Sequence, residues 1–252
     1  MKLSALLLAA ALLAPAQSPW KNSGPQSLVI QYRCTLAGRP NLREALRSEG
    51  LASLEDWKSR GIVASYHLLF SRYVDTNNWD LLAIVNFRGY DDAVRWKEVE
   101  TRRPAGLPPQ SLATIVSVAT YPTDLVRLDA PETAPPAPAW LVIPYNLTVA
   151  PDAYLRYFDE YVKPQLAGWK REGILAGYAL YMQRYTAARP WDAMLVLLYK
   201  DDSALGQRER VVAKTRAELA SDPRWLEIAN SKQSVRTEKE AIVADEIIPA
   251  RQ

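Results

Sequence analysis

The chain has 252 residues, of which 48% are hydrophobic, and it carries a formal net charge of +3. This composition, with 8 tryptophans, is typical of a packed globular protein and excludes a disordered chain. A single cysteine, Cys34, excludes an internal disulfide, and a single histidine, His67, excludes a metal centre built from several histidines. Basic and acidic residues are interleaved, so no clustered basic patch predicts a nucleic-acid partner.

Residues 1–17 have the pattern of a secretory signal peptide. Lys2 supplies a positive start, the run from Leu3 to Leu13 is apolar, and Ala14-Pro15-Ala16 places small residues at a cleavage site before Gln17. An uncleaved N-terminal anchor is the alternative interpretation. Since no later apolar run approaches the roughly 18 residues of a membrane span, we predict a periplasmic or secreted protein that leaves the membrane once this segment is removed.

The next feature in chain order is an internal repeat. Residues 57–88 return as residues 169–200 at a constant offset of 112 positions, and 11 of these 32 positions are identical. The identical pairs begin at Trp57, Lys58, Gly61, Ile62, Ala64, Tyr66, Leu68, Arg72, Tyr73, Trp79 and Asp80. A repeat of this length indicates one structural unit used twice. It divides the chain into repeat 1 (residues 25–129), a stiff Pro-rich linker (130–139) and repeat 2 (140–250).

The same order of elements is predicted in both repeats. Each begins with a strand, at residues 28–32 and 141–145, followed by a helix. Gly50 should loosen the helix of repeat 1, and Pro164 should kink that of repeat 2. The two helices end at Gly61 and Gly173, each in a left-handed cap. A β-hairpin follows (64–73 with 79–88, and 176–185 with 191–200), then a second helix and a last strand (125–128 and 241–247). This β-α-β-β-α-β order is the ferredoxin-like unit. We therefore predict an α+β fold in which two ferredoxin-like repeats place their antiparallel sheets face to face as an intrachain α/β barrel.

The repeated hairpin also suggests a strand register. If Arg72 lies opposite Asp80, Tyr73 faces Trp79, and repeat 2 places Arg184 opposite Asp192 in the same way. This register predicts an ion pair and an aromatic pair at the mouth of each hairpin.

Only one face of each hairpin can lie under the helices. One face is bulky and apolar, and it contains Tyr66, Leu68, Phe70, Leu82 and Ile84, then Tyr178, Leu180, Met182, Met194 and Val196. We assign this face to the helices, so the mixed face lines the barrel; the reverse assignment is the alternative. The polar candidates for a ligand site on the mixed face are then His67, Tyr73, Tyr181, Gln183 and Tyr185.

With its tandem copies and its Trp-Lys-x-x-Gly-Ile-x-Ala-x-Tyr and Arg-Tyr-(x)5-Trp-Asp segments, the chain resembles the dimeric α/β-barrel superfamily in its fused, two-repeat form. It is most similar to NIPSNAP-like and EthD-like members and to exported bacterial proteins of this layout. The resemblance implies a central cavity, and activities that range from cofactor-free oxygenation and haem chemistry to no reaction. The resemblance does not identify a catalytic residue in this chain. It is compatible with a homo-oligomer, although two fused repeats can form the barrel without a second chain.

Three functions remain open from the sequence. The first is a non-catalytic exported protein that binds a small apolar or aromatic ligand, without a metal or cofactor. The second is a cofactor-free monooxygenase or isomerase that uses His67 with Tyr and Gln side chains. The third is a structural or interaction module with a filled barrel. Haem ligation by His67 is a further alternative, but the counterpart of His67 in repeat 2 is Ala179, which favours a structural histidine.

Overall fold

The computed structural model describes residues 26–249, so the predicted signal peptide lies outside the described residues. The first half contains β1 (Gln26–Cys34), α1 (Arg39–Ala45), α2 (Leu51–Ser59), β2 (Ser65–Ser71), β3 (Leu81–Asn86), α3 (Tyr90–Arg102), α4 (Pro109–Leu112) and β4 (Ile115–Asp129). The second half contains β5 (Ala139–Leu147), α5 (Pro151–Tyr157), α6 (Lys163–Arg171), β6 (Leu175–Gln183), β7 (Ala193–Tyr199), α7 (Asp202–Gly206), α8 (Arg208–Leu219), α9 (Pro223–Ser231), β8 (Arg236–Glu238) and β9 (Ile242–Glu246). No described helix has the length and apolar character that crossing a membrane requires.

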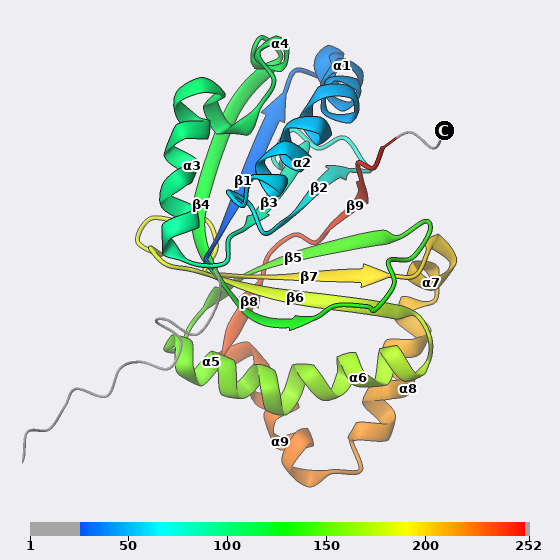
Figure 1. Ribbon diagram of the computed structural model, residues 1–252. Coiled ribbons are helices and arrows are strands. Elements are labelled where there is room, and N and C mark those ends of the chain that lie inside the picture. The colour runs from blue at the N-terminus through cyan, green and yellow to red at the C-terminus, as the bar shows by residue number, and fades with distance from the viewer. Residues whose placement is uncertain (1–25, 250–252) are drawn as a thin grey trace, which may run out of the picture.

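Eight of these strands close into one antiparallel barrel, as the sequence predicts. Their order around the ring is β7-β6-β4-β1-β3-β2-β9-β5, and pairing of β5 with β7 closes it, while β8 extends the edge of β5. The two halves meet at two seams, where β4 pairs with β6 and β2 pairs with β9. The fold is therefore α+β, with two ferredoxin-like sheets joined in a single barrel (Figure 1).

The helices cover the two outer faces of the barrel. In Figure 1, α1 to α4 lie on one side of the strands and α5, α6, α8 and α9 on the other. Each side has its own buried apolar cluster, and a third cluster, drawn from both halves, fills the interior. A sheet with one uncovered apolar face would be unstable in water, so each half needs the other to cover it.

The first long helix of each half contains a π turn, over Leu46–Gly50 between α1 and α2 and over Phe158–Val162 between α5 and α6. In the second of these turns, the Lys163 N–H bonds to the Phe158 oxygen, and Pro164, which has no N–H, follows directly. The expected loosening thus takes the form of a π turn in both halves. The predicted C-caps are confirmed, because Gly61 has φ +66° and Gly173 has φ +79°.

The predicted hairpin register is wrong by one residue. Ser71, and not Arg72, pairs with Asp80, because the Ser71 N–H bonds to the Asp80 oxygen at 2.8 Å. In the same register, His67 lies opposite Ile84. The Gln183 N–H bonds in the same way to the Asp192 oxygen, at 2.9 Å.

The predicted ion pairs at the hairpin mouths therefore do not form. Arg72 binds Asp245 instead, with 2.7 Å between Nη2 and Oδ1. Arg184 binds Asp124 at 2.5 Å. Each arginine thus binds the strand of the other half that pairs with its own strand at the seam, and not its own hairpin.

A shift of one residue moves every side chain of a strand to the other face. The bulky face of β2 and β6 lies under the helices as predicted, with Leu68 and Leu180 in the outer clusters. The assignment fails for β3 and β7, whose predicted helix-facing residues lie inside the barrel: Leu82, Ile84, Met194 and Val196. The last strand of the first half is also longer than predicted, because β4 begins at Ile115.

Candidate functional site

A cavity of about 250 Å³ lies at one end of the barrel, where β2 begins and β3 ends. We call it the barrel-end cavity. Its lining consists of Ser65, His67, Ile84, Asn86, Leu125, Leu128, Asp129, Ala130, Pro131, Trp140, Gly177, Tyr178, Ala179, Tyr181, Val196 and Leu198. Large side chains fill the middle of the barrel, among them Tyr121 and Trp191, whose rings are 5.1 Å apart. The interior is thus partly solid, with space left at its ends.

His67 is held in place at this cavity by two neighbours. Its Nδ1 lies 2.7 Å from Oε1 of Glu246 on β9, and its ring lies 4.9 Å from that of Trp140 on β5. Its side chain remains 36% exposed. When Nδ1 carries the proton that Glu246 accepts, Nε2 presents a lone pair to a ligand.

The indole of Trp140 has an unsatisfied donor. The residue is only 6% exposed, and its Nε1 is buried without a hydrogen-bond partner among the described residues. An unmade hydrogen bond of this kind costs about 1–3 kcal/mol. Because Trp140 lines the cavity, a ligand acceptor that reached this N–H would recover part of that cost.

A polar network borders the cavity on the side of β3. The Asn86 Nδ2 donates to Ser65 Oγ at 2.9 Å, and Ser27 Oγ donates to Asn86 Oδ1 at 2.7 Å. Burial raises the pKa of Tyr181 well above its usual range, and a hydrogen bond from Asn86 only partly opposes this shift. Tyr181 therefore stays neutral and can donate or accept a hydrogen bond.

The start of the Pro-rich segment covers the cavity. Ala130 and Pro131 follow β4 and contribute to the lining. Gly177 lies directly beneath them, because a Cβ at this position would come within 2.5 Å of the Asp129 oxygen and 2.9 Å of Pro131 Cδ. The start of the linker thus forms part of the cavity wall as well as connecting the two halves, and we call residues 129–132 the lid.

The five predicted ligand residues do not form one group. His67 and Tyr181 line the barrel-end cavity together. Gln183 is buried elsewhere in the barrel wall and donates to the Trp191 oxygen at 2.6 Å. Tyr73 and Tyr185 lie beyond the ends of β2 and β6 and are 69% and 66% exposed, so they do not line the barrel as predicted.

Sequence reasoning missed Trp140, Asn86 and Glu246. Trp140 precedes the predicted start of its strand, and Glu246 reaches His67 only because β9 pairs with β2 across a seam. One signal was available: the hairpin of repeat 2 has Gly177 and Ala179 where repeat 1 has Ser65 and His67. Where the strand of repeat 2 has smaller side chains than the equivalent strand of repeat 1, space is left inside the barrel.

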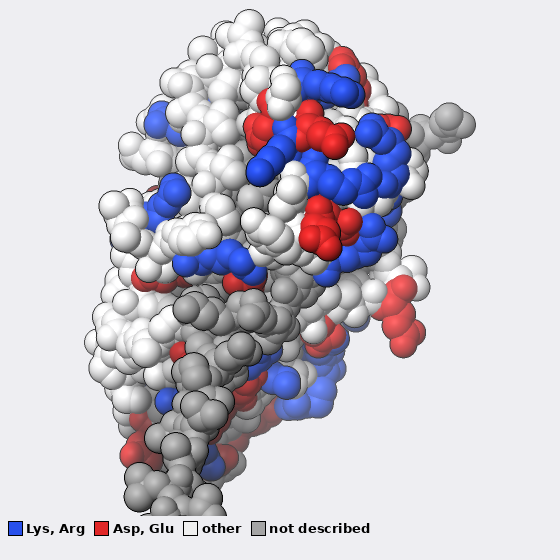
Figure 2. All heavy atoms as spheres, turned by 60° about the vertical axis from the view of Figure 1, so that its left-hand side comes forward, with Lys and Arg blue, Asp and Glu red and all other residues white. Residues whose placement is uncertain are grey.

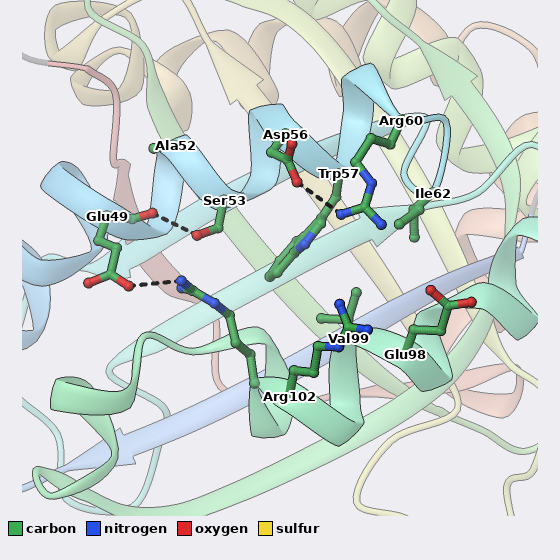
Figure 3. Close-up of a pocket in the computed structure, with 11 residues that line it drawn as sticks. Glu49, Ala52, Ser53, Asp56, Trp57, Arg60, Ile62, Glu98, Val99 and Arg102 are labelled. Atoms are coloured by element: carbon green, nitrogen blue, oxygen red, sulfur yellow. Dashed lines mark hydrogen bonds and ion pairs between the residues drawn. The ribbon is translucent and has the colours of Figure 1, made fainter.

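A second hollow lies outside the barrel, between α2 and α3 (Figure 3). Its charged groups largely neutralise one another, since Arg60 pairs with Asp56 at 3.2 Å and Arg103 with Glu49 at 3.0 Å. Figure 2 likewise shows basic and acidic side chains interleaved on the face that it presents. Because its acidic and basic side chains balance, this groove has no net charge that would select a ligand. The barrel-end cavity is therefore the better candidate.

A haem does not fit the barrel-end cavity. Its volume of about 250 Å³ is below the roughly 300–1,000 Å³ of pockets for drug-sized ligands. Haem carries two propionates, yet no Lys or Arg lines this cavity to bind them. Within residues 26–249, no three His, Cys, Asp or Glu side chains are grouped to hold a metal ion.

The comparisons with known proteins identify the fold. No protein-family model matches the sequence, and no curated protein sequence matches it. Among solved structures, a "putative monooxygenase" from Lactobacillus acidophilus NCFM has a TM-score of 0.55 and 9% identity over 89% of this chain and 95% of that one. An anthrone oxidase-like protein has a TM-score of 0.54 and 10% identity over 92% and 98% of the two chains. The chlorite dismutase of Candidatus Nitrospira defluvii, in complex with imidazole, has a TM-score of 0.51 and 12% identity over 90% and 93%.

These similarities place the chain in the class of α+β barrels with ferredoxin-like halves. At such low identity they show the fold alone. Any function therefore has to be argued from the site.

Proposed function

We propose that the barrel-end cavity binds one small, largely aromatic molecule that carries an oxygen acceptor. Trp140 lines the cavity, and its buried indole N–H, which has no partner among the described residues, is the observation that carries this proposal. Apolar side chains such as Ile84, Leu125 and Val196 provide most of the remaining surface. An apolar ligand with one acceptor would fill the space and satisfy the donor.

The volume restricts the size of this ligand. A dry cavity of about 150 Å³ is enough to hold benzene. A cavity of about 250 Å³ therefore suits one substituted ring. Ser65, Asn86 and the Nε2 of His67 provide further hydrogen-bonding groups for a second polar substituent.

The N-terminal segment and the internal repeat support a proposal for the location and the family of the protein. We infer that the protein is exported and acts in the periplasm or outside the cell, and that it is a fused member of the NIPSNAP-like and EthD-like group. One structural neighbour is named an "anthrone oxidase-like protein", and anthrone is an aromatic compound. That name supports an aromatic ligand here without assigning a reaction to this chain.

A matched pair of probes tests the proposal. Acetophenone and ethylbenzene have nearly the same shape, but only acetophenone carries an acceptor. We expect acetophenone to bind about tenfold more tightly, a difference of about 1.4 kcal/mol, and Trp140→Phe to remove this preference while keeping the ring. Equal binding of the two probes to the natural protein, or a preference that persists in Trp140→Phe, would overturn the assignment.

Two alanine variants locate the bound probe. Ala179 lines the barrel-end cavity, and Ala119 lies near the other end of the barrel. Ala179→Leu should abolish binding of acetophenone, whereas Ala119→Leu should retain it. Loss of binding in Ala119→Leu alone would place the ligand elsewhere.

A second candidate function is cofactor-free oxygenation or isomerisation of the bound molecule. The observation that favours it is the 2.7 Å contact between His67 and Glu246, because a carboxylate that orients an imidazole is a common arrangement for a general base. Oxygen consumption with a hydroquinone as the probe tests this role. Turnover that is lost in His67→Gln while acetophenone still binds supports catalysis, and the absence of turnover in the natural protein leaves binding as the function.

A further inference from the structure

The opposite end of the barrel opens into a hollow that is larger than the barrel-end cavity. We call it the opposite mouth. It has a volume of about 460 Å³, and its lining includes Trp79, Tyr121, Trp191, Arg33, Lys239 and Glu240. The register fixes its position: β1 and β3 place Ser27 beside Asn86 at the barrel-end cavity and Tyr32 beside Leu81 at the other end. The two hollows share no lining residue, so they are separate sites.

The floor of the opposite mouth is aromatic. Trp79 and Trp191, which occupy equivalent positions in the two repeats, are both buried here. Tyr121 lies against Trp191, with 5.1 Å between ring centroids. Pro144 and Pro190 add flat apolar surface. Flat rings and prolines favour a planar ligand that stacks on them.

One floor residue has an unsatisfied donor. Trp191 is 2% exposed, and its indole Nε1 is buried with no hydrogen-bond partner among residues 26–249. This donor is independent of the one on Trp140. Because Trp191 lines the hollow, a ligand acceptor that reached this N–H would satisfy it.

The rim carries a surplus of positive charge. Arg33 and Lys239 line the hollow, and neither forms an ion pair within the described part of the chain. Arg189 lies 5.5 Å above the ring of Tyr121 and adds a third cation nearby. The carboxylate of Glu240 is already engaged, since it accepts a hydrogen bond from Asn78 at 2.9 Å.

A second acidic residue is also engaged. Asp75 accepts hydrogen bonds from the Asn78 side chain and from the Asn77 backbone, and these contacts, with the nearby charge of Arg33, lower the pKa of its carboxyl. Hydrogen bonds from asparagines do not neutralise a carboxylate, so Glu240 and Asp75 stay negative. Three cations, Arg33, Lys239 and Arg189, face these two carboxylates, which leaves one positive charge in excess. This arrangement selects an anion.

We propose that the opposite mouth is a second binding site, for a planar aromatic carboxylate. The ring stacks between Trp79, Trp191 and Tyr121, and the carboxylate reaches the cations of the rim. This site differs from the barrel-end cavity in the charge of its ligand, because no Lys or Arg lines that cavity. The proposal does not depend on the function proposed for the first cavity.

Two probes of equal shape and different charge test this site. 2-Naphthoate should bind saturably and quench tryptophan fluorescence, and neutral 2-naphthamide should bind more weakly. The double substitution Arg33→Gln and Lys239→Gln should weaken naphthoate binding about tenfold, which is about 1.4 kcal/mol, because two cations near the carboxylate are lost. Added salt should weaken binding of naphthoate to the natural protein.

Controls separate this site from the rest of the surface. Arg102→Gln removes a cation from the groove between α2 and α3 and should leave naphthoate affinity unchanged. Ala119→Leu should block naphthoate, and Ala179→Leu should not, which is the reverse of their expected effects on acetophenone. The proposal is overturned if naphthoate does not bind saturably, if naphthamide binds equally well, or if the double variant binds naphthoate as the natural protein does.

Discussion

Asp80 accepts a hydrogen bond from the backbone N–H of Cys34, with 2.8 Å between Cys34 N and Asp80 Oδ2. The second half repeats the contact, since Asp192 Oδ2 accepts from the Leu147 N–H at 2.8 Å. In both halves the aspartate therefore anchors the end of the first strand to the start of the third. The repeated Trp-Asp segment thus has a structural role and does not mark a catalytic group.

Loss of this aspartate should destabilise the fold. Asp80→Ala leaves the Cys34 N–H without its acceptor and Arg39 without its ion-pair partner. We expect the free energy of unfolding in urea to fall by about 1–3 kcal/mol, because a buried group is left unsatisfied. Asp56→Ala removes an aspartate from an exposed pair on α2 and serves as the control. The interpretation fails if both variants unfold at the same urea concentration.

The left-handed cap after α6 predicts a pair of opposite effects. Gly173 has φ +79°, and an alanine there would be strained by about 1–2 kcal/mol although its Cβ meets only Lys200 Nζ at 3.4 Å. Gly206 has no positive φ, and a Cβ there meets nothing within 4 Å. Gly206→Ala should therefore stabilise the protein by about 0.4–1 kcal/mol. Thermal unfolding of both variants tests this, and equal shifts in Tm would contradict it.

The buried tyrosines make stability sensitive to alkaline pH. Burial raises the pKa of Tyr199 to about 12, opposed in part by Arg208. Below pH about 10 both the folded and the unfolded chain hold this proton, so the contribution of Tyr199 to stability is constant. Between pH 10 and pH 12 only the unfolded chain releases it. The free energy of unfolding should then fall by about 1.4 kcal/mol per pH unit for this group.

Tyr199→Phe isolates this effect, because it removes the ionisable hydroxyl and keeps the ring. Urea unfolding across the pH range should show parallel profiles for the two proteins below pH about 9, and a shallower alkaline decline for the variant. Identical declines above pH 10 would show that Tyr199 ionises normally in the folded state.

The barrel could be predicted because each half carries a strong local pattern. Gly61 and Gly173 mark the helix ends, and the bulky residues Tyr66, Leu68 and Phe70 at alternate positions mark a strand with one face under helices. The register of the hairpins could not be predicted in the same way. Every residue from Leu81 to Asn86 is buried, and so is every residue from Ala193 to Tyr199, so these strands have no polar face to indicate their orientation.

The site was harder to predict than the fold because its parts are distant in sequence. His67 and Glu246 are 179 positions apart and meet only where β2 pairs with β9. Trp140 comes from a third strand, and its importance depends on an N–H that lacks a partner, which no sequence pattern records. The prediction for Tyr73 and Tyr185 fails for a different reason. It continues the alternation of inward and outward side chains beyond Ser71 and Gln183, where β2 and β6 end.

The lid over the barrel-end cavity provides the last prediction. An alanine at Gly177 would place its Cβ 2.5 Å from the Asp129 oxygen and 2.9 Å from Pro131 Cδ, so the lid has to move outward. We expect faster backbone hydrogen exchange in residues 129–132, together with weaker binding of acetophenone, because the enclosure of the ligand is lost. Gly89→Ala is a matched control, since a Cβ there meets nothing within 4 Å. If Gly177→Ala and Gly89→Ala exchange and bind alike, the linker does not close the cavity.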